Sequence, residues 1–286
     1  MPAQALSAGP SGATGFVFTD ADFDRIRRLI KEQTGIHLSD AKRSLVYSRL
    51  GRRLRALGLA DFASYYAVVE RDEEELGRCI NAITTNLTAF FREPHHFEFL
   101  AEQVLPELKQ RHAQDRRIRI WSAGCSTGEE PYSIAMVVRE VMGAAPGWDI
   151  KILATDLDSD VVAKAASGVY ELERVAGMDE TRKRRWLRRG RGANAGRVRI
   201  APEVRELITF RQLNLMHPWP MRGPFDVIFC RNVVIYFDKE TQRRLFDRYA
   251  DILTPQGYLF IGHSESLHRV SDRFEHLGKT IYRRIR

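Results

Sequence analysis

The residues with the clearest chemical potential lie in one short segment, "WSAGCSTGEEPYSIA", at residues 121–135. A strand-like run enters a glycine-containing turn and a helical pattern leaves it, a layout that commonly holds the phosphates of a nucleotide. Two carboxylates, Glu129 and Glu130, stand where a phosphate would lie and would repel it. The turn also lacks the third glycine of the dinucleotide fingerprint and the Lys-Ser/Thr of a P-loop. The pattern therefore disfavours a phosphate ligand.

An acidic residue at the end of the next strand-like run, "ILATD", narrows the choice of ligand. Asp156 is that residue, and an acid at this point commonly accepts hydrogen bonds from ribose hydroxyls. A ligand with a ribose, no phosphate and a positive charge fits both the turn and the acid. S-adenosylmethionine has these properties, since it combines adenosine with a sulfonium and an ammonium group. The two features favour a binding site without identifying a reaction.

The same residues also have local structural interpretations. Ser126 and Glu129 have the S-x-x-E spacing of a capping box, and acids in a first helical turn complement the helix dipole. Asp156, beside Asp158, could cap the helix that follows. Cys125 is better interpreted as a small residue in a tight turn than as a nucleophile.

Composition describes a globular protein of 286 residues with a net charge of +8. Residues 1–18 are expected to form a flexible tail rather than a signal peptide, and no apolar run approaches the ~18 residues of a membrane span. The three separated cysteines show no metal-ligand spacing, so we expect free thiols, a reducing cytoplasm and no metal. Residues 41–60 carry six basic side chains and residues 182–191 seven, with no acid in either run. Such runs suit a nucleic acid, an acidic protein or an anionic membrane.

The elements that must position these residues fall into two parts. Residues 19–92 are expected to form a helical domain, with one helix from Thr19 or Asp20 and a second over about 41–57. The apolar stripe of the second helix comprises Val46, Leu50, Leu54 and Leu57. The basic flank beside it comprises Lys42, Arg49, Arg52 and Arg53. This flank is either a solvated surface or a docking face for an acidic partner.

Residues 93–286 alternate short β-rich runs with helical patterns. Such alternation predicts a Rossmann-like parallel α/β sheet with helices on both faces. The alternation is interrupted over about 170–213 by a basic helix, the glycine-rich turn "GRGANAG" and further strands. We expect that stretch to be a small β-rich insertion, attached away from the cofactor cleft.

Five motifs together resemble one family. They are "ITTNLTAFFRE" (83–93), the segment at 121–135, "ATDLD" (154–158), "FDVIFCRNVVIYFD" (225–238) and "GYLFIGHSES" (257–266). They look like the CheR-type chemotaxis receptor methyltransferases, which transfer a methyl group from S-adenosylmethionine to receptor glutamates. The resemblance covers about residues 20–286 and implies a class I methyltransferase domain preceded by an all-helical domain.

The resemblance also implies roles for residues. The implied cofactor contacts are Asn86, Thr88, Arg92, Glu130, Asp156, Asn214, Leu215, Arg231 and Asn232, with Glu129 a less favoured choice than Glu130. Arg92 and Tyr236 are the implied catalytic residues. Core positions are expected for Phe90, Phe91 and Phe97, and partly exposed structural positions for His95 and His96.

A glutamate acceptor would simplify the chemistry, because its carboxylate is already anionic at neutral pH and needs no general base. The implied partners are the cytoplasmic domains of chemotaxis receptors: an acidic helical bundle that the basic flank would dock, and in some systems a C-terminal tail peptide that the insertion would bind as an edge strand. Nucleic-acid methylation is disfavoured because the chain lacks an Asn/Asp-Pro-Pro-aromatic motif. Membrane insertion is not expected, and the enzyme is expected to be a cytoplasmic monomer.

Overall fold

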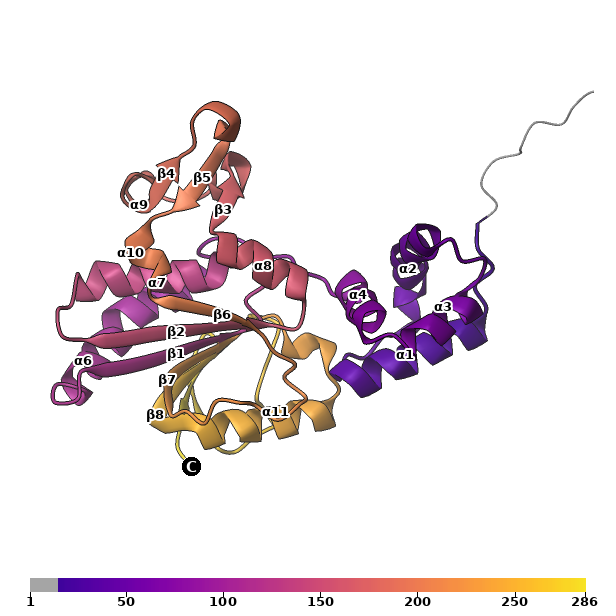
Figure 1. Cartoon of the computed structure of the whole chain (residues 1–286). Coiled ribbons are helices and arrows are strands. Elements are labelled where there is room, and N and C mark those ends of the chain that lie inside the picture. The colour runs from indigo at the N-terminus through magenta and orange to yellow at the C-terminus, as the bar shows by residue number, and fades with distance from the viewer. Residues whose placement is uncertain (1–14) are drawn as a thin grey trace, which may run out of the picture. The chain divides into compact units, whose positions relative to one another are not determined.

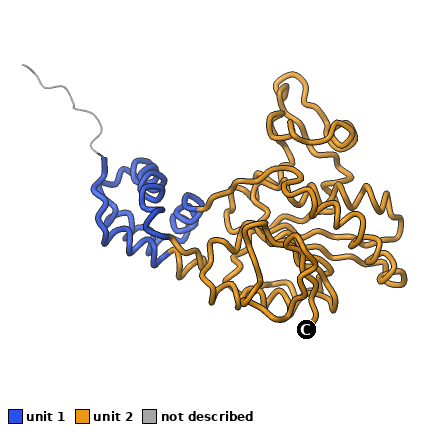
Figure 2. The backbone as a smooth tube through the Cα atoms, turned by 180° about the vertical axis from the view of Figure 1, so that it is seen from behind, with its two compact units in different colours: residues 1–29, 39–83 blue, residues 30–38, 84–286 orange. Residues whose placement is uncertain are grey.

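The computed structural model describes residues 15–286, and these form two compact units (Figure 2). Unit 1 comprises residues up to 29 together with 39–83, and unit 2 comprises residues 30–38 and 84–286. In the described part of the chain, no helix has both the length and the apolar character needed to cross a membrane.

Unit 1 is helical, as its apolar periodicity predicted. It contains most of α1 (Asp20–Thr34), the short η1 (Asp40–Lys42), α2 (Arg43–Leu57), α3 (Phe62–Val69) and α4 (Glu73–Ile83). Thr19 caps α1, because its hydroxyl accepts a hydrogen bond from the Asp22 N–H at 3.1 Å. The predicted apolar stripe of α2 is buried except at Leu57, which is 40% exposed. The helix ends at that residue, and Gly58 caps it in the left-handed conformation.

Unit 2 is built on a seven-stranded sheet (Figure 1). Its strands in chain order are β1 (Arg117–Ala123), β2 (Asp149–Asp156), β6 (Ile208–Gln212), β7 (Phe225–Cys230), β8 (Leu253–Ile261), β9 (Phe274–Gly278) and β10 (Ile281–Arg284). The spatial order is β6-β2-β1-β7-β8-β10-β9. The first five strands in this order pair in parallel, and β10 pairs antiparallel with both β8 and β9. This doubly wound arrangement confirms the predicted Rossmann-like fold.

Helices cover both faces of the sheet. One face is covered by α6 (Leu105–Arg111) and α7 (Glu129–Met142), and the other by α11 (Lys239–Ile252) (Figure 1). Residues of α5 (Pro94–Phe99) and η2 (Leu100–Val104) join the same core as α6 and α7. Side chains of β7 alternate accordingly, since Val227 and Phe229 join the first core while Ile228 and Cys230 join the second. The strands of the sheet are therefore packed between two apolar clusters.

The insertion follows α8 (Ser159–Ser167). It contains β3 (Val169–Glu171), η3 (Leu172–Val175), α9 (Glu180–Trp186), β4 (Leu187–Arg189), η4 (Gly192–Asn194), β5 (Arg197–Ile200) and α10 (Pro202–Arg205). Its three strands form an antiparallel sheet in the order β3-β5-β4. The predicted insertion at 170–213 was too long, because Ile208–Gln212 is β6 and pairs in parallel with β2 in the main sheet.

The helical domain was predicted to end at residue 92, but unit 1 ends at residue 83. Residues 84–92 are irregular and belong to unit 2, to which hydrogen bonds hold them. Thr84 Oγ1 and Asn86 Nδ2 donate to Asp158 Oδ2 at 2.7 and 2.8 Å. The Phe91 N–H donates to Ser133 Oγ at 3.0 Å. Sequence pattern alone cannot place an irregular segment whose partners lie far along the chain.

Candidate cofactor site

The glycine turn between β1 and α7 is built as the motif requires. Gly124 and Gly128 have φ angles of +102° and +98°, and Gly128 is the N-cap of α7. A Cβ at Gly124 would lie 2.3 Å from Val233 Cγ2, and one at Gly128 would lie 2.8 Å from Ala165 Cβ. Because Gly128 is the N-cap and no side chain caps it, the capping-box interpretation of Ser126 is wrong. Both positions therefore require glycine, because the backbone has a positive φ and neighbouring side chains leave no room for a Cβ.

Asp156 lies at the end of β2 and faces this turn. It accepts hydrogen bonds from the Ser126 N–H at 2.7 Å and the Asp158 N–H at 3.0 Å. The interpretation of Asp156 as a helix cap is wrong, because Asp158 is the N-cap of α8 and accepts from the Asp160 N–H at 2.9 Å. Burial raises the pKa of Asp156. One of its oxygens accepts from Ser126 and the other from Asp158, and each oxygen has a further lone pair that can accept a ribose hydroxyl.

Two further segments meet at the same edge of the sheet. Ser126 Oγ donates to the Asn86 carbonyl at 3.1 Å, which attaches the "TTNLTAFF" segment to the turn. The Leu213 N–H donates to the Asp156 carbonyl at 2.8 Å, which brings Asn214 and Leu215 beside β2. The Asn214 amide itself donates to the Gln33 carbonyl at 2.6 Å, so this side chain also links the segment after β6 to the end of α1.

The two glutamates of the turn have different partners. Glu129 is 0% exposed, forms an ion pair with Arg174 and accepts from Thr127 Oγ1 at 2.6 Å. Glu130 is 9% exposed and accepts from Ser122 Oγ at 2.7 Å and from Arg231 Nη1 at 3.1 Å. Burial raises the pKa of Glu130, although Arg231 opposes that rise. Glu130 keeps more exposed surface, and its preference over Glu129 as a cofactor contact stays a prediction.

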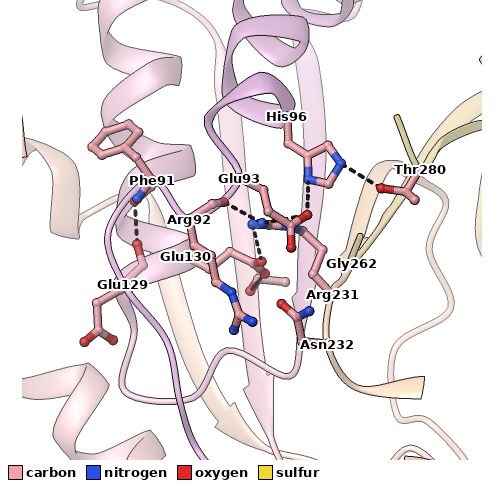
Figure 3. A network of polar contacts seen from close by, with 12 residues as sticks. Phe91, Arg92, Glu93, His96, Glu129, Glu130, Arg231, Asn232, Gly262 and Thr280 are labelled. Carbon is pink, nitrogen blue, oxygen red and sulfur yellow. Dashed lines mark hydrogen bonds and ion pairs between the residues drawn. The ribbon is translucent and has the colours of Figure 1, made fainter. Parts of the chain in front are cut away.

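Arg231 joins the motifs in one buried network (Figure 3). Its guanidinium contacts Glu130, donates to the Arg92 carbonyl and lies 3.4 Å from Glu93 Oε2. His96 is fully buried, not partly exposed as predicted, and its Nε2 lies 2.9 Å from the Lys279 carbonyl. Burial, with Arg231 nearby, lowers the pKa of His96 to about 3. Its imidazole is therefore neutral at physiological pH and structural.

In the described chain, the possible ligand atoms of Glu93, His95 and His96 lie within 4.8 Å of one another, close enough to hold an ion. The guanidinium of Arg231 already supplies a positive charge beside Glu93. The expectation that the protein needs no metal stays a prediction.

The Asn232 segment is held by a residue that sequence reasoning missed. Buried Glu265 accepts hydrogen bonds from the Asn232 N–H at 2.9 Å, the Ile235 N–H at 3.3 Å and the Gly262 N–H. Asn232 has a φ of +59°, and a Cβ at Gly262 would lie 2.4 Å from its Nδ2. Glu265 lies in the "GYLFIGHSES" motif, which was the available signal. It fixes the segment that leads into η5 (Val234–Tyr236).

The remaining predicted side chains occupy less specific positions. Phe97 is buried, and Phe90 and Phe91 are partly buried against the same core, which confirms their expected core role. Cys125 is buried, and burial raises the pKa of its thiol, so it stays protonated. Tyr236 is half-buried, and its place beside the transferred methyl group stays a prediction.

The basic flank of α2 divides into two pairs of residues. One pair, Arg49 and Arg53, forms hydrogen bonds with α4. Arg49 Nη1 donates to the Ile83 carbonyl at 2.8 Å, at the end of α4. Arg53 forms two hydrogen bonds, at 2.9 and 2.6 Å, with the buried carboxylate of Glu75. The expectation that both arginines are free surface charges was wrong, because α4 packs against this side of α2. Lys42 and Arg52 are exposed.

Comparisons with known proteins agree with this geometry. The family model described as "CheR methyltransferase, SAM binding domain" matches residues 86–283, and "CheR methyltransferase, all-alpha domain" matches residues 21–84. The chain is 47% identical to chemotaxis protein methyltransferase 2 of Pseudomonas aeruginosa over 272 residues, which cover 95% of each chain. It is 46% identical to the chemotaxis protein methyltransferase of Escherichia coli over 270 residues, covering 92% of this chain and 91% of that one.

The fold and the site define a class I S-adenosylmethionine-dependent methyltransferase. Within that class, the chain belongs to the CheR methyltransferase family and is a chemotaxis methyltransferase. Its cofactor is S-adenosylmethionine, as the anionic turn and Asp156 had suggested.

Asp156→Ala is expected to weaken binding of S-adenosylhomocysteine by about 1–3 kcal/mol, because the predicted role of Asp156 is to accept hydrogen bonds from the ribose hydroxyls, which would lose that acceptor. Calorimetric titration measures the affinity, and a melting curve verifies that the variant is folded. Asp160→Ala is a suitable control, since Asp160 is an exposed acid in the first turn of the neighbouring helix. Unchanged affinity in folded Asp156→Ala would remove this residue from the site. ATP and NADH should not compete with the cofactor.

Proposed function

We propose that the enzyme transfers the methyl group of S-adenosylmethionine to the side-chain carboxylate of specific glutamates on the cytoplasmic domains of chemotaxis receptors. The products are a glutamate methyl ester and S-adenosylhomocysteine. In this proposal it acts as a monomer in the cytoplasm and serves sensory adaptation. Support comes from the relatives, which are named chemotaxis protein methyltransferases.

The carboxylate is favoured as the methyl acceptor because the acidic side chains of the site already have hydrogen-bonding or ionic partners. Glu129 pairs with Arg174, Glu130 with Arg231, and Asp156 accepts two backbone N–H groups. Side chains engaged in this way are poor general bases, whereas an amine or hydroxyl acceptor would require proton removal. A glutamate carboxylate is anionic at neutral pH and can attack directly.

The chemistry favours a dry, aligned site. Attack of a carboxylate oxygen on the sulfonium methyl group neutralises two opposite charges, so water stabilises the reactants more than the transition state. In this proposal the half-buried Arg92 orients the acceptor carboxylate or a cofactor group, and Tyr236 fixes the acceptor by a hydrogen bond. The cofactor is held by Asn86, Thr88, Glu130, Asp156, Asn214, Leu215, Arg231 and Asn232, together with Arg92.

A labelling experiment tests this function. The enzyme is incubated with methyl-labelled S-adenosylmethionine and receptor-containing membranes, and the labelled protein is then treated with alkali. We expect label on the receptor that alkali releases as methanol, because carboxyl methyl esters hydrolyse readily. Alkali-stable label would indicate methylated nitrogen, and label on nucleic acid in a parallel reaction would support the disfavoured alternative.

The exposed part of the basic flank, Lys42 and Arg52, is proposed to attract the acidic receptor helices. Lys42→Glu together with Arg52→Glu should raise the receptor KM, most clearly at low salt, because exposed charges are screened over about 8 Å at physiological ionic strength. Arg25→Glu with Arg28→Glu on α1 is the control, since it makes the same charge change at exposed positions of unit 1. An unchanged KM at low salt would place the docking surface elsewhere.

Docking of a receptor's C-terminal tail peptide on the insertion is a separate proposal. The antiparallel sheet β3-β5-β4 has its two outer strands at the edges, where a peptide strand can add. Titration of fluorescent tail peptides would detect such binding, and methylation of a tail-less receptor at the normal rate would show that the reaction does not need it.

A further inference from the structure

The insertion contacts the cofactor turn through one arginine, Arg174 of η3. Its Nε lies 3.1 Å from Glu129 Oε1, and its Nη2 also contacts that oxygen. The same Nη2 donates to the Thr88 carbonyl at 3.2 Å and lies 3.5 Å from Thr127 Oγ1. One guanidinium therefore joins three segments that are distant in sequence: the insertion, the glycine turn and the "TTNLTAFF" segment.

A second residue of the insertion supports the same contact. The buried Tyr170 donates its hydroxyl to the Thr127 carbonyl at 2.7 Å, and its ring packs edge-on against Phe90 at 5.0 Å between centroids. A Cβ at Gly128 would lie 2.8 Å from the Tyr170 hydroxyl oxygen. The expectation that the insertion is attached away from the cofactor cleft was therefore wrong.

The ion pair between Arg174 and Glu129 neutralises a buried charge. The Glu129 carboxylate has no solvent exposure, and it contacts Arg174 and the Thr127 hydroxyl. The side chain of Arg174 is 43% exposed, so it neutralises Glu129 from the open side of the turn. The planar guanidinium holds several N–H donors in a rigid fork and can bind a carboxylate and a carbonyl at once, whereas the three donors of an ammonium group rotate on a compact charge and fix no such geometry.

We propose that Arg174 is a positioning residue for S-adenosylmethionine: by holding Thr88 and Glu129 together it fixes the relative place of two segments that line the cofactor site. The insertion is then part of the cofactor site. This inference rests on the proposed assignment of Thr88 as a cofactor contact. It is independent of the proposed acceptor, since the bound state of the cofactor requires no receptor.

Four variants test the proposal: Arg174→Met, Arg174→Lys, Arg174→Met with Glu129→Gln, and Glu129→Gln alone. Arg197→Met is the matched control, because Arg197 forms an exposed ion pair with Glu171 in the same insertion, at 3.0 Å. Affinity for S-adenosylhomocysteine is measured by calorimetry below every variant's melting transition. Hydrogen exchange of residues 84–92 is measured by mass spectrometry without ligand.

Arg174→Met should weaken binding about 10- to 100-fold, the range for losing a hydrogen bond from a charged group. Exchange over residues 84–92 should accelerate, and lysine should restore little of either property. The double variant removes the unpaired buried charge, so its melting temperature should recover while its affinity stays low. It also keeps the test valid if Arg174→Met alone does not fold.

A role in folding alone gives a different pattern. In that case the melting temperature falls in Arg174→Met, but affinity and exchange over residues 84–92 match those of the Arg197→Met control. Recovery of normal affinity in the double variant would equally overturn the proposal, because it would show that Arg174 only neutralises Glu129.

Discussion

Arg92→Ala is expected to lower the rate of methyl transfer by about 100- to 1000-fold, the range for removing one preorganised charged donor from an active site. The melting temperature should change little. The half-buried Arg92 side chain donates to the nearby Leu87 carbonyl at 2.9 Å, whereas its structural link to Arg231 runs through its own backbone carbonyl. Alanine removes the first contact and keeps the second, so the buried network of Figure 3 survives.

The measurement is a steady-state assay with receptor membranes, combined with calorimetry of S-adenosylhomocysteine. Arg211→Ala is the matched control, because Arg211 is an exposed arginine that also donates to a nearby carbonyl, that of Phe210, at 2.8 Å. Arg92→Lys should recover little activity, since lysine lacks the planar fork. A normally active Arg92→Ala enzyme, or one inactive only because it is unfolded, contradicts the role given to Arg92.

Arg53→Met is expected to destabilise unit 1 by about 3–5 kcal/mol, the usual cost of removing one partner from a buried ion pair. Its partner Glu75 is 1% exposed and also accepts a hydrogen bond from the Tyr65 hydroxyl at 3.1 Å. Without Arg53, the buried Glu75 carboxylate would keep only the longer ion-pair contact with Arg78, whose Nη1 lies 3.6 Å away, among the described residues. The loss should appear as a lower urea midpoint in far-ultraviolet circular dichroism.

Two comparisons make this prediction specific. Arg52→Met removes the exposed neighbouring arginine on the same helix and should change stability by less than about 0.5 kcal/mol. Arg53→Met combined with Glu75→Gln should recover much of the loss, because no charge is then buried alone. If Arg53→Met is as stable as Arg52→Met, Arg53 is a surface charge and joins Lys42 and Arg52 in the predicted docking face.

The success of the sequence analysis at the cofactor turn has a physical reason. Gly124, Gly128 and Asp156 are defined by local geometry: Gly124 follows the end of β1, Gly128 is the N-cap of α7, and Asp156 ends β2, so backbone shape leaves few alternatives at each. Parallel strands then bring such ends together at one edge of the sheet. The motifs therefore predicted both the fold and the segments that the structure joins there.

The predictions that were wrong concern residues whose contacts are made with partners distant in sequence. A helical wheel of α2 cannot show that α4 brings Glu75 to Arg53, or that Arg49 reaches the carbonyls at the end of α4. Nor can the strand-like run "ITFRQ" show that it pairs with β2 instead of the insertion. Arg174 was hidden in the same way, because its partner Glu129 lies 45 residues earlier in the chain.

The central claim is that the acceptor is a glutamate carboxylate, and substitution of the acceptor tests it most directly. A receptor cytoplasmic fragment is methylated, and the modified residue is located by mass spectrometry; the reaction is then repeated with that residue changed to glutamine. We predict that methylation occurs on glutamate, that alkali removes it, and that the glutamine fragment gains no methyl group at that position. Methylation that survives alkali, or that persists at the glutamine, would contradict the claim.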